Sequence, residues 1–218
     1  MYQPPHFRED SLEVQHALVR AHPLGLLVTL GSTGLVANPV PFVLDASAST
    51  FGTLKAHLSR ANTQWQDFDP SQEALIVFQG PETYITPSWY AAKREHGKVV
   101  PTWNYAIVQA YGRMRIVDDP AWLLQQITGM TDVHEAAQPR PWAVSDAPAP
   151  FVAAQLKGIV GVEIEITRIE GKWKVSQNRS EADRQGVAAG LRLSQDDASQ
   201  HMADLVDARG ALPGGRQS

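Results

Sequence analysis

Short extended apolar runs separated by turn residues constrain the fold of this chain more than any other feature. Leu24 to Leu30 is apolar with a β-branched centre, and Gly31-Ser32-Thr33-Gly34 separates it from the extended run Leu35 to Leu44. This pattern predicts a β-hairpin. Pro39 and Pro41 push its second strand toward a sheet edge or a bulge, because proline cannot donate a ladder hydrogen bond.

Similar runs recur along the chain, and each predicts a further short strand. These runs are Thr50–Leu58, Leu75–Phe78, Val99–Val100, Ile107–Val117, Ile159–Ile169 and Lys172–Ser176. Gly80-Pro81 and Glu170-Gly171 are predicted turns, the second closing another hairpin, and Gly112 is a predicted bulge. About seven strands without an internal repeat fit a small antiparallel barrel with helical additions, a mainly β, α+β fold.

Helices are predicted at both ends of the chain and in one central segment. The predicted helices cover residues 11–21, residues 120–130 behind an Asp119 cap, residues 152–157, residues 181–191 and residues 196–208. No boundary divides the chain, so residues 1–209 are expected to form a single domain. The Gly- and Pro-rich tail, residues 210–218, is expected to fray.

Composition excludes several classes of function. The 218 residues include no cysteine, which rules out disulfides, thiolate nucleophiles and Fe–S clusters. The seven histidines are scattered, so no metal site is predicted. The N-terminus is not a signal peptide, and no apolar run approaches the roughly 20 residues of a membrane span. A soluble cytoplasmic protein is expected.

Direct DNA binding is not favoured. Lys and Arg number 19 against 23 Asp and Glu, a net charge of -4, which provides no general attraction to nucleic acid. The last two predicted helices come in the order of a helix-turn-helix, but the second carries Asp196, Asp197, Asp204 and Asp207, which phosphates would repel. We therefore interpret both helices as packing elements.

Aromatic residues concentrate between Tyr84 and Tyr105. This stretch holds five of the chain's eleven Trp and Tyr residues around a basic centre with Lys93, Arg94 and Lys98. Flat rings with polar handles beside cations suit a planar, anionic ligand. A strand pair with ordinary core aromatics is the alternative interpretation.

Two polar sets could provide the rest of such a site. The first is His57-Leu58-Ser59-Arg60-Ala61-Asn62 with Lys55 just upstream, which offers the charge-assisted donors that a phosphate needs. The second is Ser176-Gln177-Asn178-Arg179-Ser180, directly ahead of a helix N-terminus. The alternatives are a solvated strand–loop junction for the first set and a plain capped helix start for the second.

Taken together, these motifs resemble the PaiB family, described as FMN-binding negative transcriptional regulators. The matching motifs are Met1-Tyr2-x-Pro-x-His6-Phe7, His57-Leu58-Ser59-Arg60-Ala61-Asn62-x-x-Trp65, Gly80-Pro81-x-x-Tyr84-Ile85-x-Pro87-Ser88-Trp89-Tyr90, Lys98-Val99-Val100-Pro101-Thr102-Trp103-Asn104-Tyr105 and Lys174-Val175-Ser176-Gln177-Asn178-Arg179, followed by Asp183-Arg184 and Gly186-Val187.

The resemblance implies an FMN-binding split β-barrel of the pyridoxamine-oxidase-like kind, in a homodimer with flavin at the subunit interface. It also implies a role as a repressor affecting protease synthesis and sporulation. Two residues depart from the family pattern, Ala56 for Gly and Thr63 for Pro. The added methyl of Ala56 would matter where backbone approaches a ligand, and Thr63 would loosen a turn.

Mapped onto that scaffold, the polar sets yield a specific hypothesis about FMN. The predicted contacts to its phosphate and ribityl chain are Lys55, His57, Arg60 and Asn62. The predicted contacts to its isoalloxazine are Ser88, Trp89, Thr102 and Asn104, with Gln177 and Asn178 from the other side. A flavin-dependent oxidoreductase, and an FMN-free binder of another planar ligand such as haem, are the alternative functions, because fold analogy alone does not settle function.

Overall fold

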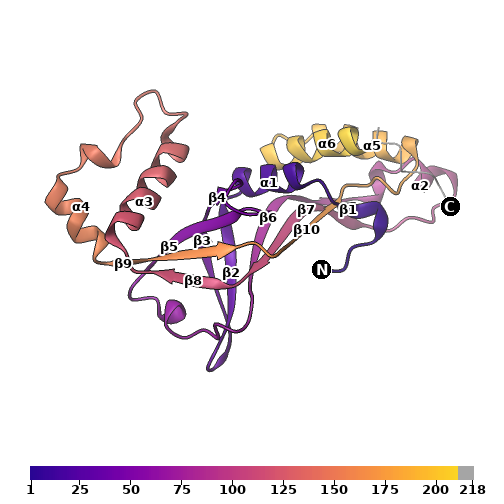
Figure 1. Cartoon of the computed structure of the whole chain (residues 1–218). Coiled ribbons are helices and arrows are strands. Elements are labelled where there is room, and N and C mark those ends of the chain that lie inside the picture. The colour runs from indigo at the N-terminus through magenta and orange to yellow at the C-terminus, as the bar shows by residue number, and fades with distance from the viewer. Residues whose placement is uncertain (211–218) are drawn as a thin grey trace. The chain divides into compact units, whose positions relative to one another are not determined.

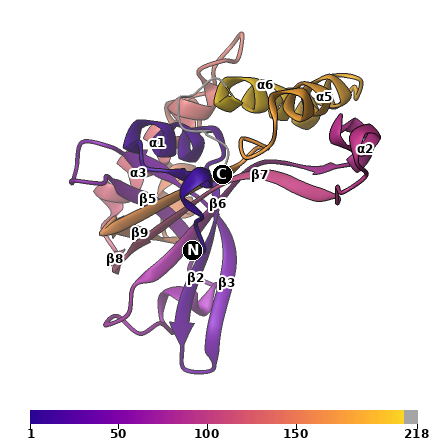
Figure 2. The same ribbon diagram turned by 90° about the vertical axis from the view of Figure 1, so that its right-hand side faces the viewer.

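A computed structural model describes residues 1–210 of the chain, so the predicted tail lies outside the described residues from position 211 onward. The chain divides into two compact units. The first unit contains Met1–Gln15, Gln79–Val108 and the chain from Glu170 onward, and the second contains His16–Phe78 and Gln109–Ile169. Figures 1 and 2 show their elements from two directions. The expectation of a single domain stays a prediction.

The second unit contains the predicted hairpin. Strands β2 (Leu24–Gly31) and β3 (Gly34–Pro41) pair antiparallel, and Gly34 has φ 116°, a conformation open to glycine. β3 is the last strand in its sheet, as its prolines predict. β2 pairs on its other side with β6 (Ala74–Ile85), where Leu26 lies opposite Val77.

A four-stranded antiparallel sheet also belongs to the second unit. Its order is β4 (Val43–Asp45), β5 (Thr53–Ser59), β9 (Ile159–Glu165) and β8 (Met114–Val117). Helices α3 (Pro120–Glu135) and α4 (Ala149–Leu156) connect β8 to β9 along the chain. The predicted cap is confirmed, because the Asp119 carboxylate accepts hydrogen bonds from the backbone N–H groups of Ala121 and Trp122.

The first unit contains β1 (Arg8–Glu9) and most of β10 (Arg168–Lys174) and β7 (Thr102–Gly112), followed in the sheet by the end of β6. Helices α5 (Glu181–Arg192) and α6 (Asp197–Gly210) lie side by side (Figures 1 and 2). Arg209 of α6 forms an ion pair with Glu9 and lies 5.2 Å from the Trp173 ring centroid. The interpretation of these helices as packing elements therefore has a direct structural basis.

The remaining short elements complete the chain. They are η1 (Pro5–Phe7), α1 (Leu12–Ala21), η2 (Thr63–Trp65), η3 (Pro87–Trp89), α2 (Ala92–Glu95) and η4 (Val144–Asp146). No helix within residues 1–210 combines the length and apolar character needed to cross a membrane.

Three local predictions were wrong. Val99–Val100 is not a strand, because β7 begins at Thr102, and Gly80-Pro81 lies within β6 rather than in a turn. Glu170-Gly171 lies within β10, where Gly171 pairs with Glu9. β9 and β10 belong to different sheets and form no hairpin. For Gly80-Pro81 and Glu170-Gly171, strand pairing over a longer stretch prevails over the local turn preference of Gly and Pro. Val99–Val100, directly before Pro101, lies outside the strands of the described residues.

Candidate functional site

The outer face of β5 carries two of the predicted site residues. Leu54, Ala56 and Leu58 point into the core, and the alternation of a strand turns Lys55 and His57 outward. Because Ala56 is 0% exposed and faces the core, its methyl group lies on the opposite face from these two side chains. The departure from the family glycine therefore leaves the outer face of β5 open.

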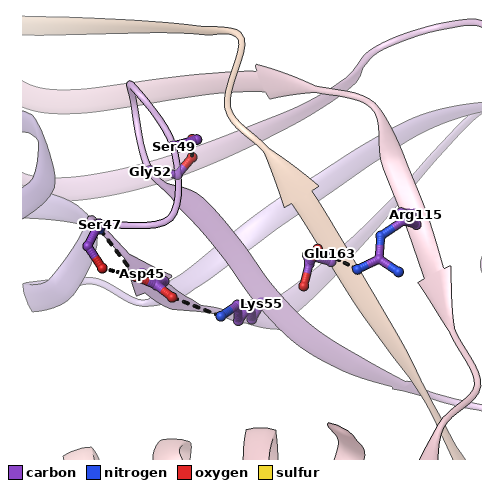
Figure 3. A network of polar contacts seen from close by, with 7 residues as sticks. All are labelled: Asp45, Ser47, Ser49, Gly52, Lys55, Arg115 and Glu163. Atoms are coloured by element: carbon purple, nitrogen blue, oxygen red, sulfur yellow. Dashed lines mark hydrogen bonds and ion pairs between the residues drawn. The ribbon is translucent and has the colours of Figure 1, made fainter.

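Lys55 is part of a charged row on this face. Its Nζ lies 2.8 Å from the Asp45 carboxylate, and this hydrogen bond is the main reason why the pKa of Asp45 falls to about 2. Glu163 lies opposite Lys55 in the register of β5 and β9, and it pairs with Arg115 at 2.5 Å. Figure 3 shows both ion pairs. Each charge of the row therefore has a partner of opposite sign.

His57 is held by a residue that the sequence did not single out. Its Nδ1 lies 2.8 Å from Oε1 of Gln126, a residue of α3 that is only 7% exposed. The Nε2 amide nitrogen of Gln126 is buried without a hydrogen-bond partner among the described residues. Leaving a buried donor unsatisfied costs about 1–3 kcal/mol.

Gln126 is also among the residues that line a pocket of about 350 Å³. It is lined by residues of β4, β5 and α3, namely Val43, Leu44, Asp45, Lys55, Trp122, Gln125, Gln126 and Gly129. Gly161 allows α3 to approach the sheet, because a Cβ there would lie 2.5 Å from Cζ3 of Trp122. The volume is in the range of small-molecule sites, roughly 300–1,000 Å³.

Arg60 and Asn62 have structural partners in the same unit. The Arg60 guanidinium bonds both carboxylate oxygens of Asp118 and donates to the Lys157 carbonyl at 3.1 Å, so it ties the start of α3 to the end of α4. This pairing lowers the pKa of Asp118. The Asn62 side chain caps η2 by accepting from the backbone N–H of Gln64 at 3.0 Å.

The other predicted residues lie in the first unit, and two of them contact neighbouring elements there. The Trp89 ring packs on α5, since a Cβ added at Gly190 would lie 2.4 Å from its ring atoms. Ser88 Oγ accepts a hydrogen bond from Lys93 at 3.1 Å. The Trp89 ring, which is predicted from the sequence to contact the isoalloxazine, therefore also packs against α5.

Asn104 and Gln177 shape the turn after β10. Asn104 is 1% exposed, and its Nδ2 donates to Ser176 Oγ at 3.0 Å. Ser176 has φ 67°, a backbone conformation that is higher in free energy for a residue with a Cβ. Such a conformation persists only when the surrounding structure stabilises it. Gln177 adds support by accepting from the Val175 N–H at 2.8 Å, while Asn178 is exposed.

Two lysines of β10, Lys172 and Lys174, are not among the predicted site residues, although Lys174 begins one of the family motifs. Lys174 Nζ donates to Thr102 Oγ1 at 2.5 Å and to the Trp103 carbonyl. Burial lowers its pKa, and the positive charges of Lys172 and Arg179 lower it further. The spacing of Lys172 and Lys174 on a strand was the available signal, whereas no sequence pattern marks Gln126.

The ten predicted residues thus divide between the units. Lys55, His57, Arg60 and Asn62 lie in the second, and Ser88, Trp89, Thr102, Asn104, Gln177 and Asn178 lie in the first. That all ten contact one FMN molecule stays a prediction. Among residues 1–210, no three His, Asp or Glu side chains are grouped as they would be to hold a metal ion.

Antiparallel sheets with helices define a mixed α/β protein, and comparison with known proteins identifies its family. Residues 1–168 match the family described as "Putative FMN-binding domain". The chain is 30% identical to the protease synthase and sporulation protein PAI 2 of Bacillus subtilis, over 95% of this chain and 97% of that protein. It is 34% identical to an uncharacterised protein of Emericella nidulans, over 97% and 98% of the two chains. The chain belongs to this FMN-binding, PaiB family.

Solved structures agree on the fold. The flavocytochrome Anf3 of Azotobacter vinelandii superposes with a TM-score of 0.56 at 14% identity, covering 77% of this chain and 69% of that one. A conserved hypothetical protein of Mycobacterium tuberculosis gives 0.53 at 16% identity, covering 80% and 90%. The predicted antiparallel split-barrel fold with peripheral helices is confirmed.

Proposed function

We propose that this protein binds FMN and that the pocket between β5 and α3 holds a polar part of the flavin. The observation that carries this proposal is that Gln126, whose Nε2 is buried without a hydrogen-bond partner among residues 1–210, lines the same pocket as Lys55. A ligand acceptor that reached this donor would remove the cost of leaving it unsatisfied. FMN offers such acceptors in its phosphate, its ribityl hydroxyls and its ring carbonyls.

The charges of this pocket restrict how FMN binds. Asp45 lines the pocket together with Lys55 and is ionised above pH of about 2, so it repels a phosphate. A lysine ammonium has three donors, so Lys55 can hold Asp45 and still donate to a neutral hydroxyl or a phosphate oxygen. His57 donates its Nδ1 proton to the Gln126 amide oxygen, which leaves Nε2 of the neutral imidazole as an acceptor for a ribityl hydroxyl. These groups fit the ribityl–phosphate end of FMN.

The first unit, taken by itself, carries groups that suit a flat ring such as an isoalloxazine. Thr102, exposed Asn178 and half-buried Trp89 provide a hydroxyl, an amide and a flat face for it. Asn104 is a positioning residue, because its buried amide holds the Ser176 turn. When bound, FMN supplies reversible one- or two-electron chemistry, and the protein residues bind and orient it.

We propose that the FMN-bound protein has a regulatory role. The Bacillus subtilis relative carries a name that refers to protease synthesis and sporulation. The net charge of -4 and the acidic surface of α6, where Asp204 and Asp207 pair with Arg192, argue against direct contact with DNA. We infer that regulation acts through a partner or a metabolite.

A homodimer is part of the proposal. β2 and β3 expose an outer face made only of apolar side chains, the β2–β3 outer face, consisting of Leu24, Leu26, Val28, Leu30, Leu35, Ala37, Pro39 and Pro41. Leu24 is 63% exposed and Leu35 is 78% exposed. Contiguous exposed apolar surface of this kind marks interaction sites. A second copy of the chain would bury it, in agreement with the homodimer that the family resemblance implies.

Reconstitution with FMN tests the proposal. Purified protein, freed of any flavin, is titrated with FMN, and flavin fluorescence reports the affinity. We expect saturable binding, release of FMN on denaturation, and affinity at least about 10-fold weaker in the His57→Ala/Lys55→Met double variant, since the charge-assisted bond lost with Lys55 alone costs about 1.5–3 kcal/mol. Protein that binds haemin but not FMN would support the alternative planar ligand, and failure to bind FMN would refute the proposal.

A further inference from the structure

Lys172 of β10 is a buried cation without an anionic partner among residues 1–210. The residue is 8% exposed, and its Nζ lies 5.3 Å from the ring centroid of Tyr105 and 5.4 Å from that of Tyr2. No carboxylate lies within ion-pair distance of this ammonium in the described part of the chain. A buried charge is normally paired, because removing it from water is costly.

Lys174 places a second ammonium at the same tyrosine ring. Residues two apart on a strand project from the same face, and Lys174 Nζ lies 5.9 Å from the Tyr105 centroid. Its two hydrogen bonds go to neutral oxygens, those of Thr102 and Trp103, so its charge is not compensated and a third donor remains. The lowered pKa of Lys174 agrees with crowding of positive charge, since Lys172 and Arg179 contribute to it after burial.

Exposed aromatic rings lie on the neighbouring strands. Trp103 precedes Tyr105 by two positions on β7, so both side chains project from one face of that strand. Trp103 is 54% exposed and Tyr84 is 46% exposed, and their ring centroids lie 6.1 Å apart in an edge-to-face arrangement. Exposed rings of this size are available to contact a flat ligand.

We propose that these five residues, which we call the lysine–tyrosine face (Tyr84, Trp103, Tyr105, Lys172 and Lys174), bind a small planar anion, a flat ring that carries one carboxylate or phosphate. The acidic group accepts from the ammonium groups of Lys172 and Lys174, and the ring contacts Trp103. This inference uses residues of the first unit alone. It does not rest on the proposed flavin site, and none of the five is among the ten predicted flavin contacts.

A purely structural role for the lysines makes a different prediction. Ammonium groups over tyrosine rings contribute about 0.5–2 kcal/mol each through cation–π attraction, without any ligand. If that is their whole role, replacing one lysine changes stability and leaves ligand binding unaffected. The two roles are therefore distinguished by measuring affinity and stability on the same variants.

Calorimetric titration of flavin-free protein provides the test, with four probes that separate charge from shape. Naphthoate and naphthyl phosphate are planar anions, naphthalenemethanol is their neutral analogue, and inorganic phosphate lacks the ring. We expect at least one planar anion to bind, with the neutral analogue and inorganic phosphate each at least about 10-fold weaker. Which planar anion binds more tightly identifies the acidic group.

Variants assign the binding to this face. Lys172→Met and Lys174→Met should each weaken the planar anion about 10- to 100-fold, the equivalent of one charge-assisted hydrogen bond. Lys172→Arg should retain most of the affinity, and Lys157→Met, an exposed lysine of the second unit, should have no effect. If Lys172→Met does not fold, Trp103→Ala at a half-exposed position should still weaken naphthoate.

Three results would overturn the inference. One is equal binding of naphthoate and naphthalenemethanol, which would indicate apolar adsorption only. Another is unchanged affinity in both lysine variants while their thermal stability falls. The third is loss of naphthoate binding when the protein is saturated with FMN, which would assign the lysines to the flavin itself. Failure of FMN binding in the reconstitution leaves the first two measurements possible, so the two proposals can fail independently.

Discussion

The amide oxygen of Gln126 lies 2.8 Å from Nδ1 of His57, while the amide nitrogen of the same side chain is buried with no acceptor within residues 1–210. One half of the amide therefore stabilises the fold and the other half weakens it. Gln126→Leu removes a hydrogen bond worth about 1 kcal/mol together with an unsatisfied donor that costs about 1–3 kcal/mol. We expect the free energy of unfolding in urea to change by less than about 1 kcal/mol, and FMN to bind about 10-fold more weakly.

Gln138→Leu is the matched control for this prediction, because the residue is exposed and does not line the pocket. Neither its stability nor its FMN affinity should change. A large loss of stability in Gln126→Leu with unchanged FMN affinity would show that the amide serves the fold alone.

Trp89 and Gly190 define the contact between η3 and α5. A Cβ at Gly190 would lie 2.4–2.5 Å from three ring atoms of Trp89, closer than real Cβ contacts. We expect Gly190→Ala to lower the free energy of unfolding by about 1–3 kcal/mol, the usual cost of overpacking, despite the better helix propensity of alanine. Chemical denaturation measures this change.

Gly129 of α3 provides the comparison, since a Cβ there meets nothing within 4 Å. Gly129→Ala should raise the free energy of unfolding by up to about 1 kcal/mol. If both alanine variants were equally stabilised, the Trp89 ring would not be locked against α5.

Much of the fold could be predicted because it depends on local chemistry. The Gly31–Gly34 turn, the edge position of β3 and the Asp119 cap each follow from what proline, glycine or aspartate does to its own backbone. The errors at Gly80-Pro81 and Glu170-Gly171 have the opposite origin. Strand pairing such as that between Gly171 and Glu9 involves partners far apart in the sequence, which turn propensities cannot anticipate.

The candidate site could be predicted in residue type but not in arrangement. His57 and Lys55 were identified from their own chemistry, whereas Gln126 is an ordinary helical glutamine until α3 is placed on β5. Trp89 and Asn104 were expected to meet a ligand, and the structure shows that each also contacts the protein's own α5 or Ser176. Polar and aromatic residues are suited both to packing and to ligand binding, so the sequence alone does not show which of the two roles a given residue has.

The β2–β3 outer face predicts how the chain assembles. Leu30 and Leu35 lie opposite each other across the hairpin, and Leu35 is 78% exposed. Leu35→Glu costs little in a monomer, but in a dimer it would bury a charge without a partner. We expect light scattering after size exclusion to show a dimer for the wild type and a shift toward monomer for Leu35→Glu.

Leu193→Glu is the control for assembly, because Leu193 is 85% exposed but lies after α5 and outside the β2–β3 outer face. It should remain dimeric. A monomeric wild type, or an equal effect of both substitutions, would refute the assignment of this face to a second copy.

The Asp45–Lys55 ion pair predicts a defined dependence of stability on pH. The pKa of the Asp45 carboxyl is about 2 in the folded protein, against an ordinary value of 3.8, and the hydrogen bond from Lys55 is the largest cause of this lowering. Because the folded-state pKa is the lower one, Asp45 stabilises the fold fully above its ordinary pKa and loses this contribution as the pH falls toward 2. Since the side chain is 33% exposed, we expect only about 1 kcal/mol of difference in unfolding free energy between wild type and Asp45→Asn near neutral pH. That difference should shrink in acid, and it should be smaller at every pH in a Lys55→Met background. A difference that persists undiminished at the lowest pH would show that Asp45 acts through contacts that do not depend on its charge.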